Sequence, residues 1–167
     1  ETNGKTIKGS LVNGDTRVNT AQSKFGGASA FFDGSGDYLA TSSRADFDMG
    51  SGDFTIDFWL KTSQTGTTFI GGQTVAAGNE YTRLMLNNGK IQGGIRTNIT
   101  FRGIESTSTV NDSIWHHVAF VRDGSTLRLF IDGTQENTFN VGSELHQDVV
   151  AQFAIGRTGE YNDQYFN

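Results

Sequence analysis

The chain of 167 residues contains no cysteine and no proline. Without cysteine it can form no disulfide, no thiolate zinc site and no iron–sulfur cluster, and it has no cysteine nucleophile. About eight prolines would be typical of this length. Their absence leaves every backbone N–H able to join a β-sheet ladder. Glycine is abundant at 22 residues, and we expect it at tight turns and at crowded strand positions.

Positive charge is also scarce, because the chain has 13 basic and 18 acidic residues and a net charge of −5. No basic cluster is present, so nucleic acids and anionic membranes have little electrostatic attraction to this chain. No apolar run approaches the ~20 residues of a membrane-spanning helix. The sequence therefore predicts neither nucleic-acid binding nor membrane insertion, and its length fits a single domain.

Apolar residues recur mostly at every second position, in short runs separated by Gly, Asn, Asp and Ser, a pattern typical of β-strands joined by turns. The clearest strand spans Phe54 to Lys61. Its apolar residues share one face, and Asp57 and Trp59 lie on the other. No segment indicates a helix.

Asn88-Gly89 predicts a type I′ hairpin turn between Tyr81 to Asn87 and Lys90 to Arg96, since both turn positions need positive φ. Counting outward from this turn pairs Leu86 with Ile91 on one face. Arg83 falls opposite Gly94 on the other face, where an arginine would have room to lie flat across the sheet.

A second hairpin is predicted between Trp115 to Arg122 and Ser125 to Asp132. A turn at Asp123-Gly124 would pair Val118 with Leu129 on a core face. Shorter strands are predicted at Thr6 to Val12, Ala28 to Asp33, Tyr38 to Ser42, Thr67 to Gly72, Asn98 to Ser106, Thr134 to Val141 and Gln152 to Arg157. Their number and spacing indicate an all-β fold, a two-sheet antiparallel sandwich or jelly roll.

Several segments occur in one order and together are similar to a known family: Ser23 to Ala30, Phe32-Asp33-Gly34 with Gly36-Asp37-Tyr38-Leu39, Gly52 to Lys61, Trp115 to Ala119 and Leu127 to Gly133. The chain resembles the laminin-G-like, concanavalin A-like lectin/glucanase jelly rolls of bacterial surface proteins, secreted enzymes and phage virion proteins. The resemblance implies two curved antiparallel sheets used for binding, often of glycans and sometimes with calcium. The fold also hosts structural spacers and glucanases, so it does not define the chemistry.

The resemblance covers nearly the whole chain and implies one domain over residues 1–167. Family members usually follow the equivalent of Tyr165-Phe166-Asn167 with a glycine and a strand resembling Ile-Asp-Glu-Val-Arg-Ile. We therefore expect a fragment that lacks its C-terminal strand, or a neighbouring chain that supplies it, because an uncovered sheet edge is a liability. A sheet with no unpaired edge near Tyr161 to Asn167 would contradict this expectation.

An enzyme is not expected from the residue inventory. The glucanases of this fold carry alternating acidic residues on one strand, which places both carboxylates on one face. The strand at Phe54 to Lys61 offers Asp57 alone, and no serine-hydrolase, zinc-protease or phosphate-loop motif is present.

His116 and His117 are adjacent on a strand and point to opposite faces, so they cannot jointly hold one metal. We expect His116 to pack beside Ile131 with a hydrogen-bonded ring. A calcium site is predicted at Asp33 and Asp37, where a glycine-rich loop lets oxygen ligands converge. A plain turn is the alternative at this position.

Six residues form the predicted ligand-binding face, because flat rings and planar hydrogen-bonding groups suit sugars: Asp57, Trp59, Tyr81, Arg83, Gln92 and Arg96. This prediction assumes that their strands share one sheet. The alternatives are that a second domain packs on this face, or that binding occurs at loops Gly71 to Glu80, Asn98 to Arg102 and Gly156 to Tyr165.

The sequence thus predicts a non-catalytic recognition or adhesion module that binds a glycan or cell-surface polysaccharide. Such a module belongs in a larger extracellular, cell-surface or virion-surface protein. The alternative is a structural or assembly module of a phage tail or capsid appendage, with neighbouring subunits as partners. A glucanase-like hydrolase is the third and least favoured function, because the paired carboxylates are missing.

Overall fold

The computed structural model describes residues 10–41, 47, 49, 52–74, 80–144, 152–157 and 165–167. The strands are β1 (Ser10–Asn13), β2 (Arg17–Asn19), β3 (Ser29–Phe31), β4 (Tyr38–Thr41), β5 (Phe54–Leu60), β6 (Thr67–Thr74), β7 (Glu80–Asn87), β8 (Lys90–Arg96), β9 (Phe101–Thr109), β10 (His116–Asp123), β11 (Thr126–Ile131), β12 (Thr134–Asn140) and β13 (Phe153–Ile155). The sequence missed β2, and the first part of the predicted strand Thr6 to Val12 lies outside the described residues.

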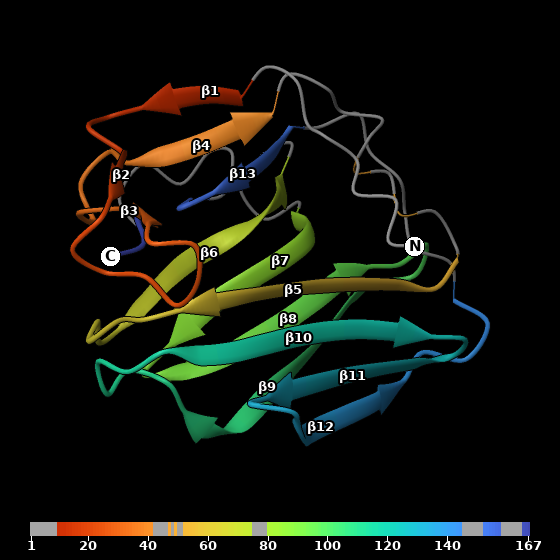
Figure 1. Ribbon diagram of the computed structural model, residues 1–167. Coiled ribbons are helices and arrows are strands. Elements are labelled where there is room, and N and C mark those ends of the chain that lie inside the picture. The colour runs from red at the N-terminus through yellow and green to blue at the C-terminus, as the bar shows by residue number, and fades with distance from the viewer. Residues whose placement is uncertain are drawn as a thin grey trace.

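The strands form two layers (Figure 1). The larger sheet has seven strands in the order β1-β4-β13-β6-β7-β8-β9, and the smaller has four in the order β12-β11-β10-β5. Strands β2 and β3 form a separate hairpin. The predicted antiparallel sandwich is confirmed. Over the described ranges, no helix has the length and apolar character needed to cross a membrane.

The core lies between the four-stranded sheet and the β6 to β9 half of the larger sheet. Leu84, Leu86 and Ile91 reach it from β7 and β8, and they meet Val118 and Phe120 of β10. The alternation of buried and part-exposed residues along β10 and β11 follows directly from the period of two in the sequence. Hydrophobic burial in this half of the molecule therefore holds the two sheets together.

The β7–β8 hairpin has the predicted turn and register. Asn88 has φ 51° and Gly89 has φ 84°, as a type I′ turn requires. Leu86 pairs with Ile91, and Arg83 pairs with Gly94. Gly94, however, leaves room for the ring of Phe101, since a Cβ there would lie 2.4 Å from Phe101 Cζ. Arg83 lies on top of that ring and not directly on the sheet.

The predicted register of the β10–β11 hairpin is wrong by two residues. Val118 pairs with Ile131 and not with Leu129, because Asp123 pairs with Thr126 and the turn is Gly124-Ser125. Gly124, with φ 55°, occupies the first central position, which a type II′ turn reserves for glycine. Moving a turn by one residue shifts every cross-strand pair by two residues. The same side chains therefore still point to the core, as predicted.

The assumption that β5 shares a sheet with the β7–β8 hairpin is also wrong. β5 pairs along its whole length with β10, in the four-stranded sheet. Alternation in a sequence shows which side chains share a face, but it does not show which strands are hydrogen-bonded neighbours. The outward faces of β5 and of the hairpin therefore lie on opposite sides of the sandwich.

Gly93 provides a test of how tightly the two sheets pack. A Cβ at Gly93 would lie 2.7 Å from Cδ2 of Phe120, and Phe120 is fully buried. We expect Gly93→Ala to lower the free energy of unfolding by about 1–3 kcal/mol, because overpacking strains a core. Urea unfolding measures this as a lower midpoint. Gly52→Ala is the matched control, since among the described residues, its chain neighbours apart, no atom lies within 4 Å of its Cβ position. Equal midpoints for both variants would contradict the expectation.

Candidate functional site

The six predicted ligand residues occupy two separate surfaces. Asp57 and Trp59 lie on the outer face of β5, in the four-stranded sheet. Tyr81, Arg83, Gln92 and Arg96 lie on the outer face of β7 and β8, in the seven-stranded sheet. One ligand-binding face made of all six residues is therefore excluded, and each surface has to be considered alone.

The Trp59 surface, which we define as Lys24, Phe25, Asp57, Trp59 and His117, is an aromatic and charged cluster. The ring of Trp59 lies 5.2 Å from that of His117 and 5.4 Å from that of Phe25, which meets it edge-on. Lys24 Nζ lies 4.3 Å above the Trp59 ring. Asp57 Oδ2 lies 3.3 Å from His117 Nε2. Phe25 is 66% exposed and Trp59 is 36% exposed. Solvent therefore reaches two adjacent rings, with the positive charge of Lys24 and the negative charge of Asp57 beside them.

The second surface, on β7 and β8, is made of groups that already bind one another. Arg83 Nη2 donates a 2.7 Å hydrogen bond to Gln92 Oε1. The Arg83 guanidinium also lies 4.3 Å from the centre of the Phe101 ring, and Arg96 lies 5.9 Å from that of Tyr81. A ligand at either surface would have to compete with such contacts. The difference is that the Phe25 ring on the Trp59 surface is largely exposed.

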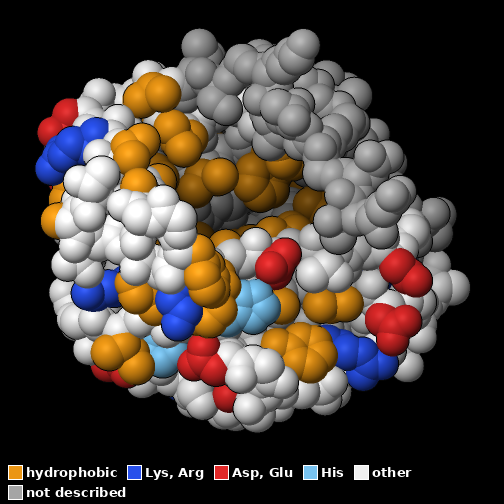
Figure 2. All heavy atoms as spheres, in the orientation of Figure 1, with side chains coloured by type: hydrophobic (Ala, Val, Ile, Leu, Met, Phe, Trp, Pro, Cys, Tyr) orange, Lys and Arg blue, Asp and Glu red, His pale blue; other side chains and the backbone are white. Residues whose placement is uncertain are grey.

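An apolar groove opens beside the Trp59 surface. The hollow near the centre of Figure 2 is lined with hydrophobic side chains, and the cavity measures about 430 Å³. Its apolar lining includes Leu39, Ile56, Phe58, Ile70, Phe153 and Phe166, and its polar lining includes Asn19, Gln22, Asp57 and Lys61. The groove and the Trp59 surface share Asp57 and Trp59 as a common border.

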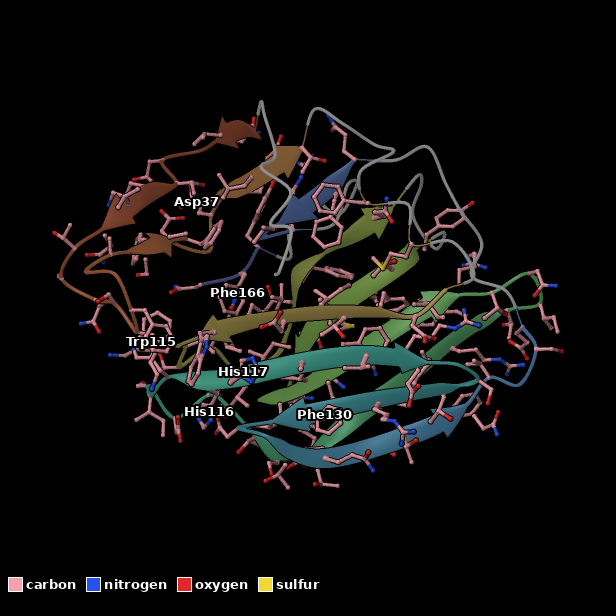
Figure 3. All side chains as sticks on the ribbon, turned by 45° about the vertical axis from the view of Figure 1, so that its right-hand side comes forward. Asp37, Trp115, His116, His117, Phe130 and Phe166 are labelled. Atoms are coloured by element: carbon pink, nitrogen blue, oxygen red, sulfur yellow. The ribbon has the colours of Figure 1, made fainter. Side chains whose placement is uncertain are left out.

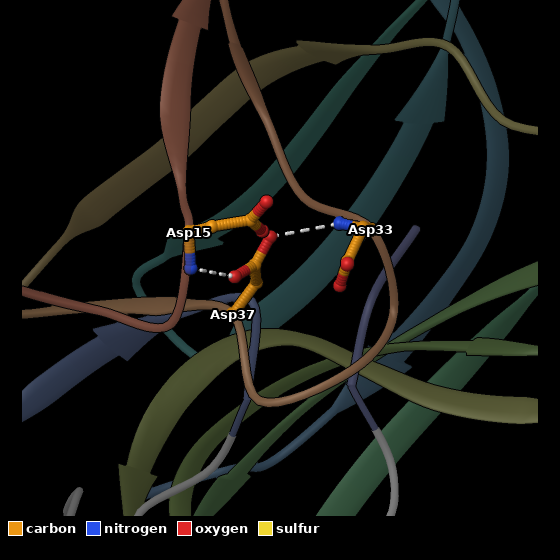
Figure 4. Close-up of side chains that lie close together, drawn as sticks. All are labelled: Asp15, Asp33 and Asp37. Carbon is orange, nitrogen blue, oxygen red and sulfur yellow. Dashed lines mark hydrogen bonds between the residues drawn. The ribbon is translucent and has the colours of Figure 1, made fainter.

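The predicted calcium ligands Asp33 and Asp37 lie together, and the structure adds Asp15 (Figure 4). The three carboxylates each place one oxygen within 4.8 Å of the others. Asp37 is fully buried, and its two oxygens accept backbone N–H bonds of 2.8 Å from Asp15 and 2.9 Å from Asp33. Gly14 is required beside it, since a Cβ there would lie 2.2 Å from Asp37 Oδ1. Asp37 therefore ties two loops together whether or not a cation is bound.

His116 is buried between two carboxylates, and His117 points to the opposite face of β10 (Figure 3). His116 Nδ1 lies 2.7 Å from Asp132 Oδ2, and Nε2 lies 3.0 Å from Asp112 Oδ1. Carboxylates only accept hydrogen bonds, so both ring nitrogens donate when the imidazole is protonated. On the β11 side Ile131 pairs with Val118 and is not directly opposite His116, whereas the expected hydrogen-bonded ring is present.

This arrangement shifts three pKa values. Burial by itself lowers the pKa of His116, but the hydrogen bonds to Asp132 and Asp112 outweigh it and the net shift is upward. The pKa of Asp112 is lowered by the Ile114 N–H and then by His116. Burial opposes the shift at Asp132, but the His117 N–H and the His116 ring lower its pKa overall. The charged forms of all three groups therefore support one another.

Sequence reasoning missed Asp15, Lys24 and Phe25 as site residues. Lys24 and Phe25 lie in a glycine-rich segment between β2 and β3, without the alternation that marks strand faces. The hydrogen bond of 2.6 Å from Lys61 Nζ to Gln22 Oε1 helps to hold this segment against β5. Of the alternative loops, residues 75–79 and 158–164 lie outside the described residues, and Asn98 to Arg102 forms a turn with Ile99 68% exposed.

A family model described as the concanavalin A-like lectin/glucanases superfamily matches residues 33–167. The chain therefore belongs to this superfamily, in agreement with the resemblance carried by its sequence motifs. No curated protein sequence matches the chain.

Solved structures share the fold at low sequence identity. The receptor-binding domain of botulinum neurotoxin C/D mosaic serotype aligns with a TM-score of 0.69 and 14% identity, over 95% of this chain and 39% of that one. The ligand-binding domain of botulinum neurotoxin serotype D, in complex with N-acetylneuraminic acid, gives the same four values. Domains LG4-5 of the mouse laminin alpha1 chain align at 0.57 and 13%, over 68% of this chain and 31% of that one. This chain thus spans two fifths or less of the length of these structures.

The His116 cluster generates a prediction for the pH dependence of stability. Because folding raises the pKa of His116, this residue stabilises the folded state fully below about pH 6.5. That stabilisation is lost as the pH rises through the pKa of His116 in the folded protein. The lowered aspartate pKa values contribute stability above about pH 3.9 that is lost as pH falls through them. We therefore expect wild-type protein to have a lower urea midpoint near pH 9 than near pH 5.5, with a smaller difference in His116→Gln. His117→Gln is the control. An unchanged difference in His116→Gln would show that other groups cause the pH dependence.

Proposed function

We propose that this domain is a non-catalytic recognition module that binds carbohydrate through the Trp59 surface. The observation that carries this proposal is the pair of adjacent, solvent-accessible rings at Phe25 and Trp59, with Asp57, His117 and Lys24 around them. Sugars present C–H patches that pack on aromatic rings, and hydroxyl groups that bond to nearby charged groups. This surface offers both features within one cluster.

The known relatives support a binding role at the level of the fold. The toxin domains are receptor-binding and ligand-binding domains, and one is in complex with N-acetylneuraminic acid. This sugar is an anion, and Lys24 and Lys61 place positive charge beside Trp59 in a chain that is acidic overall. The proposal places the module in a larger protein of the extracellular space, a cell surface or a virion surface.

A glycan array that includes N-acetylneuraminic acid tests the proposal, followed by calorimetry with any sugar that binds. We expect Trp59→Ala and Phe25→Ala each to weaken binding about tenfold or more, which corresponds to ~1.4 kcal/mol. Both side chains are on the surface, so thermal unfolding should confirm that the variants remain folded.

Arg83→Ala is the matched control, because it removes a cation-aromatic contact from the opposite side of the sandwich. Loss of binding in Arg83→Ala with none in Trp59→Ala would move the site to the β7–β8 surface. No glycan binding, together with an ordered oligomer that buries Trp59 and Phe25, would favour the alternative of a structural module in a phage tail or capsid appendage.

We also propose that the carboxylates of Asp15, Asp33 and Asp37 bind a calcium ion. Their clustered oxygens support this site. Calcium takes about six to eight oxygen ligands, so backbone carbonyl groups and water would have to complete the coordination. Asp15 and Asp33 are exposed and can turn toward a cation, while Asp37 is fixed by its two backbone donors.

A comparison of Tm in calcium and in a chelator tests this second proposal. At a calcium concentration about 100 times Kd, binding would stabilise the fold by about 2.7 kcal/mol, so Tm should rise in the wild type. Asp15→Asn should abolish the rise, because it removes one carboxylate but keeps the backbone N–H that Asp37 accepts. Asp123→Asn, at an exposed aspartate elsewhere, should keep it. A wild-type Tm that calcium does not move would leave Asp37 as a purely structural acceptor.

A further inference from the structure

The outer face of the smaller sheet continues beyond the Trp59 surface. Ala119 of β10 pairs with Asp57 of β5 on one side and with Phe130 of β11 on the other. Directly paired residues point to the same face of a sheet, so the Phe130 ring shares the outward side of Asp57. His117 and Phe130 lie on the neighbouring strands β10 and β11 (Figure 3), and both are part-exposed. This face therefore carries an aromatic ring on each side of β10, with Trp59 on β5 and Phe130 on β11.

Small side chains separate these two rings. Ala119 occupies the middle of the row between Asp57 and Phe130, and Val121 follows it on the same face of β10. The strands β5 and β11 are two strand spacings apart, or about 10 Å, and Trp59 is offset from the row of Asp57 by ~7 Å along β5. One pyranose ring therefore cannot stack on Trp59 and on Phe130 at once. A chain of linked sugars can cross the low floor from one ring to the other.

A pair of opposite charges borders Phe130, just as Asp57 and Lys24 border Trp59. Arg128 precedes Phe130 by two residues and lies on the same face of β11. Its Nη2 donates a hydrogen bond of 3.2 Å to Asp123 Oδ2, and the two side chains are 33% and 64% exposed. The two charges neutralise each other, so this end of the face suits an uncharged sugar whose hydroxyl groups bond to either partner.

We propose that Phe130, Arg128 and Asp123 form a second sugar subsite, and that the ligand is an oligosaccharide lying across β5, β10 and β11. This inference rests on the proposed carbohydrate binding at the Trp59 surface and specifies the class of its ligand. A single sugar fills only the Trp59 end of the face. Once one sugar is bound there, contact of a linked sugar with Phe130 is intramolecular, so affinity rises with chain length until both rings are covered.

A saccharide suits this face better than a packed protein partner. Charged side chains border both rings, whereas the buried cores of protein interfaces are depleted in charged residues. Sugars combine apolar C–H patches with hydroxyl groups around the same ring, so they match an aromatic side chain that has charged groups beside it. A protein partner is therefore treated as an outcome of the test.

A glycan array of neutral and sialylated chains, from single sugars to hexasaccharides, tests the proposal, with calorimetry on the glycans that bind. Trisaccharides and longer chains should bind about tenfold or more tighter than the single sugars they contain. Phe130→Ala should remove most of this gain and leave the affinity for single sugars unchanged. Trp59→Ala should weaken the binding of short and long chains alike.

Three further variants separate recognition by the ring from a structural effect. Phe130→Trp keeps an aromatic face and should retain the gain with chain length, whereas Phe130→Leu keeps only apolar bulk and should lose it. Phe139→Ala is the matched control, because Phe139 is a 38% exposed ring of the same sheet whose pairing with Leu127 places it off the outer face. It should bind as the wild type does, and thermal unfolding should show that all the variants are folded.

The outcomes distinguish failure of the second subsite from failure of the proposed function. Equal affinity for single sugars and longer chains, or unchanged binding in Phe130→Ala with loss in Trp59→Ala, would overturn the second subsite alone. An equal loss in Phe139→Ala and Phe130→Ala would also overturn it, because the effect would then not depend on the outer face. No glycan binding by the wild type would overturn both proposals. An oligomer that Phe130→Ala dissociates would then assign this face to a second copy of the chain.

Discussion

The packing of β5 against the core is the constraint on which the rest of the structure depends. Phe54, Ile56, Phe58 and Leu60 all point inward, and this commits Asp57 and Trp59 to the outside. One side of β5 therefore joins the two sheets, and the other side supplies the Trp59 surface. Its second edge, which no strand of the described ranges pairs with, borders the groove. A shift of one residue in the pairing of β5 with β10 would exchange these faces and destroy both the core and the surface.

Hydrogen bonds from side chains fix the segments that strand pairing leaves loose. Asp37 joins the loops that contain Asp15 and Asp33. His116 joins Asp112, which precedes β10, to Asp132 in the turn after β11. Asp37 and His116 are both buried, and each is hydrogen-bonded to the polar groups that face it. Each therefore holds two segments of the sandwich together without a disulfide. This is how a domain without cysteine keeps its loops in place.

Segments distant in sequence meet at the Trp59 surface and the adjoining groove. Residues 22–25 contribute Lys24 and Phe25, β5 contributes Trp59, β10 contributes His117, and the described C-terminal residues line the adjoining groove.

The sequence by itself determined the all-β class, most of the strands, the inward and outward faces of the longer ones and the β7–β8 turn. These are local properties, because side-chain direction follows from strand geometry and turn type follows from the φ that Asn88 and Gly89 can adopt. Tertiary structure decided that β5 pairs with β10 and not with the hairpin, that Asp15 joins Asp33 and Asp37, and that Phe25 lies against Trp59. These contacts join residues far apart in the chain, and neither periodicity nor turn chemistry specifies which distant segments will pack together.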